Sequence, residues 1–154
     1  MRVAIGADHA GFELKDIIKQ TLDELRVAYK DFGTDSDDSV DYPDYAARVG
    51  KAVAGGDFDR GILVCGTGIG MALAANKITG VRAAPVVDLE SARLAREHNN
   101  ANVLAIGARV TPPARALDLV RLFLKTEFEG GRHERRLQKV AALEGAPAPV
   151  KTGA

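Results

Sequence analysis

The chain of 154 residues is long enough for one domain of average size, and its 21 basic and 21 acidic side chains give a formal net charge of zero. A neutral chain is a poor general binder of nucleic acids or membrane surfaces, and the single cysteine excludes an internal disulfide or a CxxC metal pair. The sequence contains neither a signal-peptide pattern nor an apolar run of about 20 residues that could span a membrane, so we expect a cytoplasmic protein.

Short apolar runs alternate with helical patterns along the chain. Runs that are apolar at consecutive positions are typical of strands buried on both faces, and they stand at Val3–Ile5, near Val27–Phe32, and at Gly61–Cys65, Val81–Val87 and Asn102–Ile106. Apolar spacings of three and four predict a helix along Leu14–Leu25, and further helices at about Asp44–Ala54, Met71–Asn76, Leu89–Glu97, Pro113–Thr126 and His133–Leu143. This alternation predicts a three-layer α/β domain over residues 1–143, with a mostly parallel five-stranded sheet. Residues 144–154, rich in Pro, Ala and Gly, are expected to form a flexible C-terminal tail.

Ligands of a parallel sheet bind at the carboxyl ends of its strands, and the strongest motif of the chain stands at such a place. Cys65-Gly66-Thr67-Gly68-Ile69-Gly70 follows the third predicted strand and opens a helix. Its glycines let successive backbone N–H groups converge on one oxyanion, and the same groups favour the thiolate of the cysteine. A thiolate beside an oxyanion site suits nucleophilic attack or removal of a proton alpha to a carbonyl. The alternative is a buried core cysteine before a turn that merely needs glycine.

The same loop lacks the patterns of other known phosphate sites. No Lys-Ser/Thr pair follows it, as a P-loop requires, and its third glycine comes one place too early for a dinucleotide-binding fingerprint. Met71 stands where a small cysteine phosphatase would need an arginine, and Cys65 stands where a receiver domain would need an aspartate.

Polar residues also follow the first strand and the fourth helix. Asp8 and His9 end the first strand, where they suit binding of hydroxyls or phosphate, although a helix-capping Asp beside a surface His would give the same pattern. His98 and Asn99 end a helix before the fifth strand, where Asn also serves left-handed backbone geometry. The three histidines have no i, i+4 or HxH spacing, so the sequence predicts no metal site.

The basic residues gather towards the end of the chain, since residues 78–154 hold 12 basic and 8 acidic side chains. Arg132 and Arg136 are four apart and therefore share one face of a helix, where two guanidinium groups can grip one phosphate. Arg109, after the fifth strand, is a third candidate. The alternative is an ordinary solvated basic helix face.

Five blocks, in order, resemble the type B ribose-5-phosphate isomerases, a group that includes the galactose-6-phosphate isomerase subunits. The blocks are GADHAG (6–11), DYPDYA (41–46), CGTGIG (65–70), EHNNANVLAIGAR (97–109) and FEGGRHERR (128–136). The resemblance runs from residue 1 to about 143 without a large insertion. It implies a Rossmann-like domain that forms a homodimer or a dimer of dimers with sites at the subunit boundary. It also implies aldose–ketose isomerisation of a phosphosugar without a metal or organic cofactor, a step of the pentose phosphate pathway.

The resemblance assigns roles to individual residues. Cys65 is implied as the base that moves a proton between C1 and C2, and Thr67 and His98 as the groups that open the furanose ring. The enediolate oxygen is expected to meet the backbone N–H groups of Gly66, Gly68, Ile69 and Gly70. Sugar hydroxyls are assigned to Asp8 and Asn99, a pocket wall to Tyr42, and the phosphate to His9, Arg109, Arg132 and Arg136. The partner subunit is expected to supply His98, Asn99 and Arg109.

The substrate expected first is ribose 5-phosphate with its product ribulose 5-phosphate. The same chemistry on a tetrulose 4-phosphate, allose 6-phosphate or galactose 6-phosphate is the near alternative. A non-catalytic sugar-phosphate-binding subunit is a further alternative, against which the presence of Cys65, Thr67, His98 and both distal arginines argues.

Overall fold

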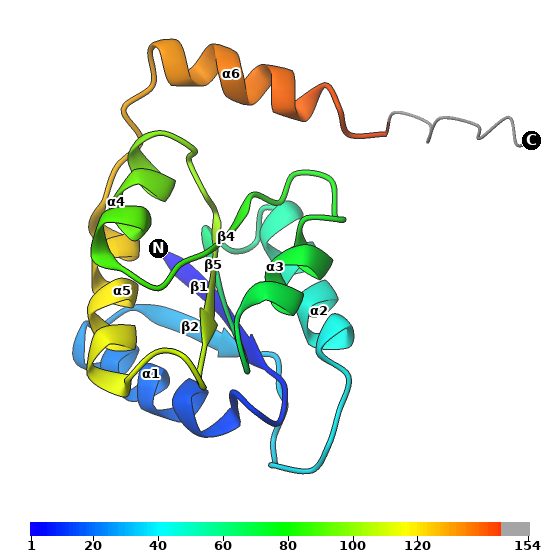
Figure 1. Ribbon diagram of the computed structural model, residues 1–154, viewed down its shortest axis with the longest axis vertical. Helices are drawn as coiled ribbons and strands as arrows, with labels where there is room; N and C mark the ends of the chain where they lie inside the picture. Colours follow the sequence, from blue (N-terminus) through cyan, green and yellow to red (C-terminus); the bar gives the residue numbers. More distant parts are fainter. Residues whose placement is uncertain (146–154) are drawn as a thin grey trace, which may run out of the picture.

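The structure, a computed structural model, describes residues 1–145 and consists of one parallel sheet between two layers of helices (Figure 1). The strands are β1 (Arg2–Ala7), β2 (Ala28–Asp31), β3 (Arg60–Cys65), β4 (Ala83–Pro85) and β5 (Val103–Gly107), in the order β2-β1-β3-β5-β4. The helices are α1 (Phe12–Glu24), α2 (Tyr42–Ala54), α3 (Ile69–Ala75), α4 (Leu89–Glu97), α5 (Pro113–Lys125) and α6 (Arg132–Ala141). The predicted α/β fold is confirmed. The predicted tail lies outside the described residues except for its first two.

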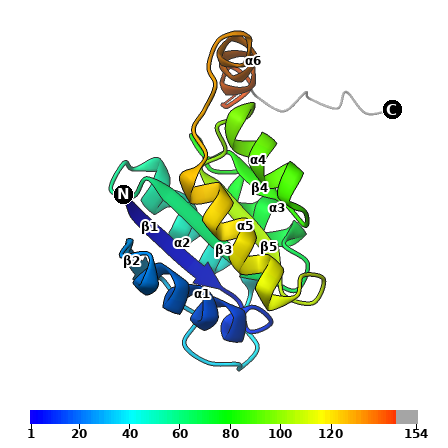
Figure 2. The ribbon, with the colours of Figure 1, turned by 90° about the vertical axis from the view of Figure 1, so that its left-hand side faces the viewer.

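Each face of the sheet carries its own apolar core. Helices α1, α4 and α5 cover one face, where Ile18 and Phe123 are fully buried, and α2 and α3 cover the other, where Val49 and Met71 are fully buried (Figures 1 and 2). Because β1, β3 and β5 are covered on both sides, their sequences are continuously apolar after the arginine that begins β1 and β3. No helix within residues 1–145 is both long and apolar enough to cross a membrane.

The two edge strands, β2 and β4, are shorter and less buried than the central strands. The fourth strand, predicted over Val81–Val87, is only Ala83–Pro85, because the N–H of Val81 still belongs to the turn after α3 and bonds the carbonyl of Ile78 (3.1 Å). Strand β2 alternates exposed and half-buried residues along its length. A short strand ending in proline at one edge and a polar strand at the other both limit pairing with further strands.

Helix α6 stands apart from the three layers, beyond the amino ends of the strands (Figure 1). His133 is its one buried residue, and the apolar side chains of Val140 and, just past the helix, Leu143 are exposed. A helix of this kind gains little from packing on its own domain. Its exposed apolar side is therefore available to another surface.

The strand order places one crevice at the carboxyl edge of the sheet. The chain moves from β1 outward to β2 and then crosses to β3 on the other side of β1, so the order reverses between β1 and β3. Loops that leave two neighbouring parallel strands in opposite directions open a crevice between them, which is where ligands of such sheets bind. Asp8 and Cys65 stand at this point.

A buried ion pair connects α1 to the carboxyl end of β2, at the same edge of the sheet as the crevice. The Lys15 side chain is 1% exposed, and its Nζ atom donates to both carboxylate oxygens of Asp31 (2.8 Å each) and to the carbonyl of Thr34 (2.5 Å). Lys19 Nζ reaches the same carboxylate at 2.8 Å. Burial alone would raise the pKa of the Asp31 carboxyl, but the hydrogen bonds from Lys15, Lys19 and the N–H of Gly33 outweigh it and hold the pKa below its ordinary value.

Asp31→Asn is expected to lower the free energy of unfolding at pH 7 by about 2 kcal/mol, because it leaves the Lys15 ammonium buried without its counter-charge. Since the native pKa of Asp31 is lowered, the stabilisation is complete above the ordinary Asp pKa of about 3.9 and is lost as the pH falls through the native value. Urea unfolding of both proteins between pH 7 and pH 3 measures the difference, with Asp37→Asn, an exposed aspartate, as control. A deficit that does not shrink at acid pH would show that the carboxylate charge is not its source.

Candidate active site

A small cavity of about 240 Å³ opens at the crevice between β1 and β3, and most of the predicted site residues meet there. It is lined by Asp8, His9, Ala10, Tyr42, Cys65, Gly66, Thr67, Gly70 and Arg109. These residues come from the loops after β1, β3 and β5 and from the start of α2. The fold thus assembles on one chain what the sequence holds in four separate blocks.

Cys65 ends β3, and its side chain points to the face of the sheet that α2 and α3 cover. It is 4% exposed, so it belongs to the core and to the wall of the cavity at once. The Sγ atom accepts a hydrogen bond from the N–H of Gly68 at 3.2 Å. Gly68 adopts φ +79°, a conformation that glycine reaches without strain, and this turn brings its N–H back to the sulfur. This hydrogen bond therefore holds the sulfur against the turn that follows β3.

The backbone amides of the Cys65 loop fall into two groups. The N–H of Gly68 bonds Cys65 Sγ, and the N–H of Ile69 bonds Thr67 Oγ1 at 3.3 Å. The N–H groups of Gly66, Thr67 and Gly70 have no acceptor among residues 1–145, and they therefore remain as donors for an oxyanion. The amides of Gly68 and Ile69 thus hold the loop in this structure, and the predicted binding of an oxyanion by the loop amides stays a prediction. The side chain of Ile69 is exposed.

Two close approaches fix the shape of this loop. A Cβ atom on Gly107, at the end of β5, would lie 2.4 Å from the carbonyl carbon of Thr67. A Cβ atom on Gly70 would lie 2.7 Å from the Tyr42 ring, which packs directly against the backbone there. Both positions therefore need glycine. Gly107 was not among the predicted site residues, although a glycine at the carboxyl end of a central strand was a usable sign.

Asp8 and His9 are both tied to the backbone around the cavity. One carboxylate oxygen of the buried Asp8 accepts the N–H groups of Ala10 and Gly11 at 3.0 and 3.1 Å. His9 Nδ1 accepts the N–H of Val40 at 3.1 Å, so its Nε2 carries the hydrogen of the neutral ring. The carboxylate therefore keeps its second oxygen for a ligand, and His9 is oriented as a donor.

Arg109 lies over the Cys65 loop of its own chain, which differs from the expectation that a partner subunit supplies it. Its guanidinium is 2.8 Å from the position that a Cβ atom of Gly66 would take. The N–H of Arg109 bonds the Gly66 carbonyl at 2.9 Å, and the N–H of Ala108 bonds the Cys65 carbonyl at 2.8 Å. These bonds align the loops after β3 and β5. This alignment places the Arg109 side chain over the Cys65 loop.

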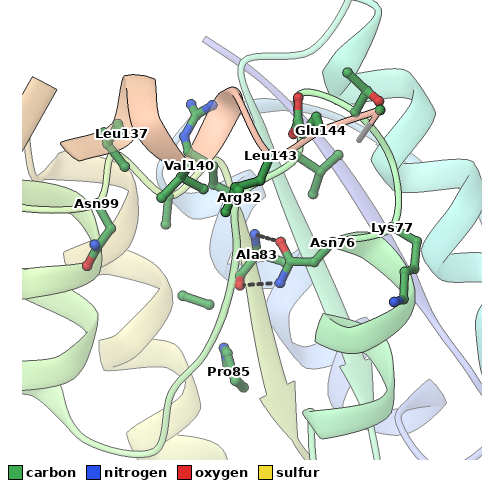
Figure 3. A pocket seen from close by; sticks show the side chains of 15 residues that line it. Asn76, Lys77, Arg82, Ala83, Pro85, Asn99, Leu137, Val140, Leu143 and Glu144 are labelled. Carbon is green, nitrogen blue, oxygen red and sulfur yellow. Dashed lines mark hydrogen bonds between the residues drawn. The ribbon is translucent and has the colours of Figure 1, made fainter. Parts of the chain in front are cut away.

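The remaining predicted residues, His98, Asn99, Arg132 and Arg136, lie at the opposite edge of the sheet. His98 caps the carboxyl end of α4 and so precedes β5, whereas Cys65 and Gly107 stand where the strands end. The length of β5 alone separates the two edges by roughly 15 Å. Asn99 borders a second cavity, of about 830 Å³, whose other wall carries Leu137 and Val140 of α6 (Figure 3). One chain therefore does not bring His98 to Cys65.

His98 is stacked on His133, with ring centroids 4.1 Å apart and ring planes inclined by 13°. Burial lowers the pKa of His133, and the nearby His98 and Arg132 act in the same direction. Glu129 lies beside both rings, with one carboxylate oxygen 3.5 Å from His133 Nε2 and 4.0 Å from His98 Nε2. Glu129 and His133 are four residues apart, but sequence spacing did not indicate this group because His98 comes from a distant part of the chain.

Comparison with known proteins places the chain among sugar-phosphate isomerases. The sequence pattern of the ribose/galactose isomerase family matches residues 3–140. The chain is 47% identical to ribose-5-phosphate isomerase B of Escherichia coli (strain K12), over 93% of this chain and 96% of that one. It is 41% identical to D-erythrulose-4-phosphate isomerase of Pectobacterium atrosepticum, over 94% and 95%.

Solved structures agree with this likeness. Ribose-5-phosphate isomerase B of Clostridium thermocellum superposes with a TM-score of 0.93 at 48% identity, covering 94% of this chain and 97% of that one. The enzyme of Mycoplasma genitalium with bound ribulose-5-phosphate superposes with a TM-score of 0.90 at 43% identity, covering 95% and 97%.

Proposed function

The chain belongs to the ribose/galactose isomerase family, and from this we propose that it interconverts ribose 5-phosphate and ribulose 5-phosphate with the Cys65 thiolate as base. The surroundings of Cys65 in the structure support its proposed role as the base. Cys65 lines the cavity at the switch point of the sheet, and its Sγ atom accepts one amide hydrogen bond. The N–H groups of Gly66, Thr67 and Gly70 in the same loop have no acceptor within residues 1–145.

In the proposed reaction, the thiolate takes the proton from C2 of the open-chain aldose. The electron pair of that C–H bond forms the C1–C2 double bond of an enediolate, and the negative charge moves to O1. The amides of Gly66 and Thr67 stabilise that oxygen more strongly than the ground-state carbonyl, which lowers the barrier. The thiol then returns the proton to C1, while the O2 proton passes to O1 and C2 becomes the ketone carbon. Atoms and electrons balance without an external oxidant or reductant.

The phosphate is proposed to bind away from the reacting carbons. His9 and Arg109 donate to it from the same chain as Cys65, and Arg132 and Arg136 are proposed to reach it from a second copy together with His98 and Asn99. His98 and Thr67 act on the ring oxygen and the anomeric hydroxyl during ring opening. Asp8 and Asn99 bind sugar hydroxyls, and Tyr42 forms one wall.

A homodimer is proposed because the two groups of site residues lie on opposite edges of one chain. Apolar side chains next to the cavity support it: Ile69 and Leu73 of α3 are 58% and 62% exposed, and Val87 beside the edge strand β4 is 55% exposed. Exposed apolar side chains of this kind are typical of an interface between subunits. A two-fold contact through it would place the His98 edge of one chain near the Cys65 edge of the other.

The substrate is tested by assaying the purified protein against four-, five- and six-carbon sugar phosphates. The highest kcat/KM is expected for ribose 5-phosphate. The likeness to a D-erythrulose-4-phosphate isomerase favours one second candidate, the tetrulose 4-phosphate. A preference of tenfold or more for that substrate would replace the first assignment while retaining the chemistry.

Arg136→Ala is expected to raise KM for the phosphosugar at least about tenfold with a smaller change in kcat, because a charge-assisted contact to the phosphate supplies mainly binding energy. Steady-state kinetics of the variant measure both constants. Arg135→Ala, which removes the neighbouring exposed arginine of α6, is the matched control and is expected to leave KM unchanged. Equal effects of the two substitutions would show a general loss of positive charge, and an unchanged KM in Arg136→Ala would place the phosphate elsewhere.

A further inference from the structure

Three side chains beyond the amino ends of the strands offer metal-ligating atoms to one point. His98 comes from the end of α4, Glu129 from the segment between α5 and α6, and His133 from the first turn of α6. One ligand atom from each lies within 4.8 Å of the other two. The Glu129 carboxylate oxygen is 3.5 Å from His133 Nε2 and 4.0 Å from His98 Nε2.

The backbone around these side chains is held in place by hydrogen bonds. The N–H of Glu129 bonds the carbonyl of Glu97, the last residue of α4, at 3.0 Å, so Glu129 is fixed next to His98. The N–H of His133 bonds the carbonyl of Gly130 at 3.2 Å, and the His133 side chain is 7% exposed. The backbone of Glu129 and His133 is thus fixed before any ion arrives, and the His133 ring is buried as well.

We propose that His98, Glu129 and His133 form a binding site for Zn²⁺ or a transition-metal ion of similar preference. Two imidazoles and one carboxylate are a donor set that zinc accepts, with water as the fourth ligand. Nitrogen donors favour such ions over Mg²⁺ and Ca²⁺, which take oxygen ligands. Bonds of about 2.0–2.2 Å require the two stacked rings to tilt until both Nε2 lone pairs meet at the ion. The His98 side chain is 36% exposed and stands at a helix end, so it is the ring with room to move.

The charges around the proposed site determine the affinity that we expect for a divalent ion. Arg132 and Arg136 add positive charge near His133, which opposes a divalent cation, and Glu129 supplies one negative charge. A moderate affinity, with Kd on the order of micromolar, is therefore expected.

Metal binding has a consequence that rests on the proposed function. The ion would occupy the Nε2 lone pair of His98, which the isomerase mechanism uses for proton transfer at the sugar ring. Zn²⁺ bound here is therefore inhibitory, and chelation restores turnover.

The site is tested by calorimetric titration of ZnCl₂ into a Cys65→Ser variant, in which the thiol no longer competes for zinc. One ion per chain is expected, and Glu129→Gln or His133→Gln in the same background is expected to weaken binding at least tenfold. Glu134→Gln, which changes an exposed acid of the same helix, is the matched control and is expected to bind normally. Co²⁺ is expected to give a tetrahedral absorption spectrum without a sulfur charge-transfer band.

Absence of binding in the Cys65→Ser variant, or equal binding in Glu129→Gln and Glu134→Gln, would overturn the proposal. Activity assays separate it from the proposed function. Zinc bound with the expected ligand dependence in a protein that isomerises no phosphosugar would leave the metal site standing and remove the isomerase assignment. Turnover that survives saturation of this site would remove the inhibitory role.

Discussion

Cys65→Ala is expected to lower kcat for isomerisation by about 10³-fold or more while leaving the Kd for the phosphosugar within a few-fold of the wild type. The substitution removes the proposed base, and a positioned base contributes typically 10²–10⁴-fold. The proposed phosphate contacts, which would supply the binding energy, are untouched. Steady-state kinetics and calorimetric binding of ribose 5-phosphate measure the two quantities separately.

A packing effect must be separated from the chemical one, because Cys65 is also part of the apolar core on the α2–α3 side. Cys65→Ser keeps the size of the side chain and the acceptor for the Gly68 N–H, but its hydroxyl is a far weaker acid than a thiol and is not ionised near neutral pH. Similar losses of kcat in the serine and alanine variants, with unchanged melting temperatures, assign the loss to the thiolate. Wild-type turnover in either variant would remove Cys65 from the mechanism.

The fold followed from the sequence wherever local pattern and burial agree. The central strands β1, β3 and β5 are covered on both faces, so consecutive apolar residues specify them without reference to neighbours. The expectation was less accurate at Val81–Val87, because the apolar run there combines a turn, an edge strand and an exposed residue. The boundaries between the turn, the strand and the exposed residue depend on the position of this strand at the edge of the sheet. That position is a property of the whole sheet and cannot be derived from the local sequence.

The part of the site formed by one continuous loop was predictable from the sequence. Contacts between segments that are distant in the sequence were less predictable. The glycines between Cys65 and Gly70 predict a loop that could bind a ligand through its amides, and the strand order places that loop at the switch point. The place of Arg109 depends on backbone bonds between the loops after β3 and β5, which no spacing in the sequence reveals. The contact of His98 with His133 likewise depends on the path of the chain after α5.

Mixing two inactive variants, Cys65→Ala and His98→Ala, is expected to restore about a quarter of wild-type activity. If each site takes Cys65 from one chain and His98 from the other, a mixed dimer has one site that lacks both groups and one that holds both. Random pairing makes half of all dimers mixed, and each carries one working site of two. Refolding the variants together from denaturant, followed by the isomerase assay, measures the recovery.

The control pairs Cys65→Ala with Thr67→Ala, two substitutions at the same edge of the sheet. Every site in their mixed dimers lacks one of the two groups, so no recovery is expected, whichever way the chains pair. Recovery in both mixtures would point to exchange with residual wild-type protein. No recovery in either mixture, with dimers shown by size, would mean that His98 does not act across the boundary. The roughly 15 Å between the two edges of one chain would then leave His98 outside the isomerase site altogether.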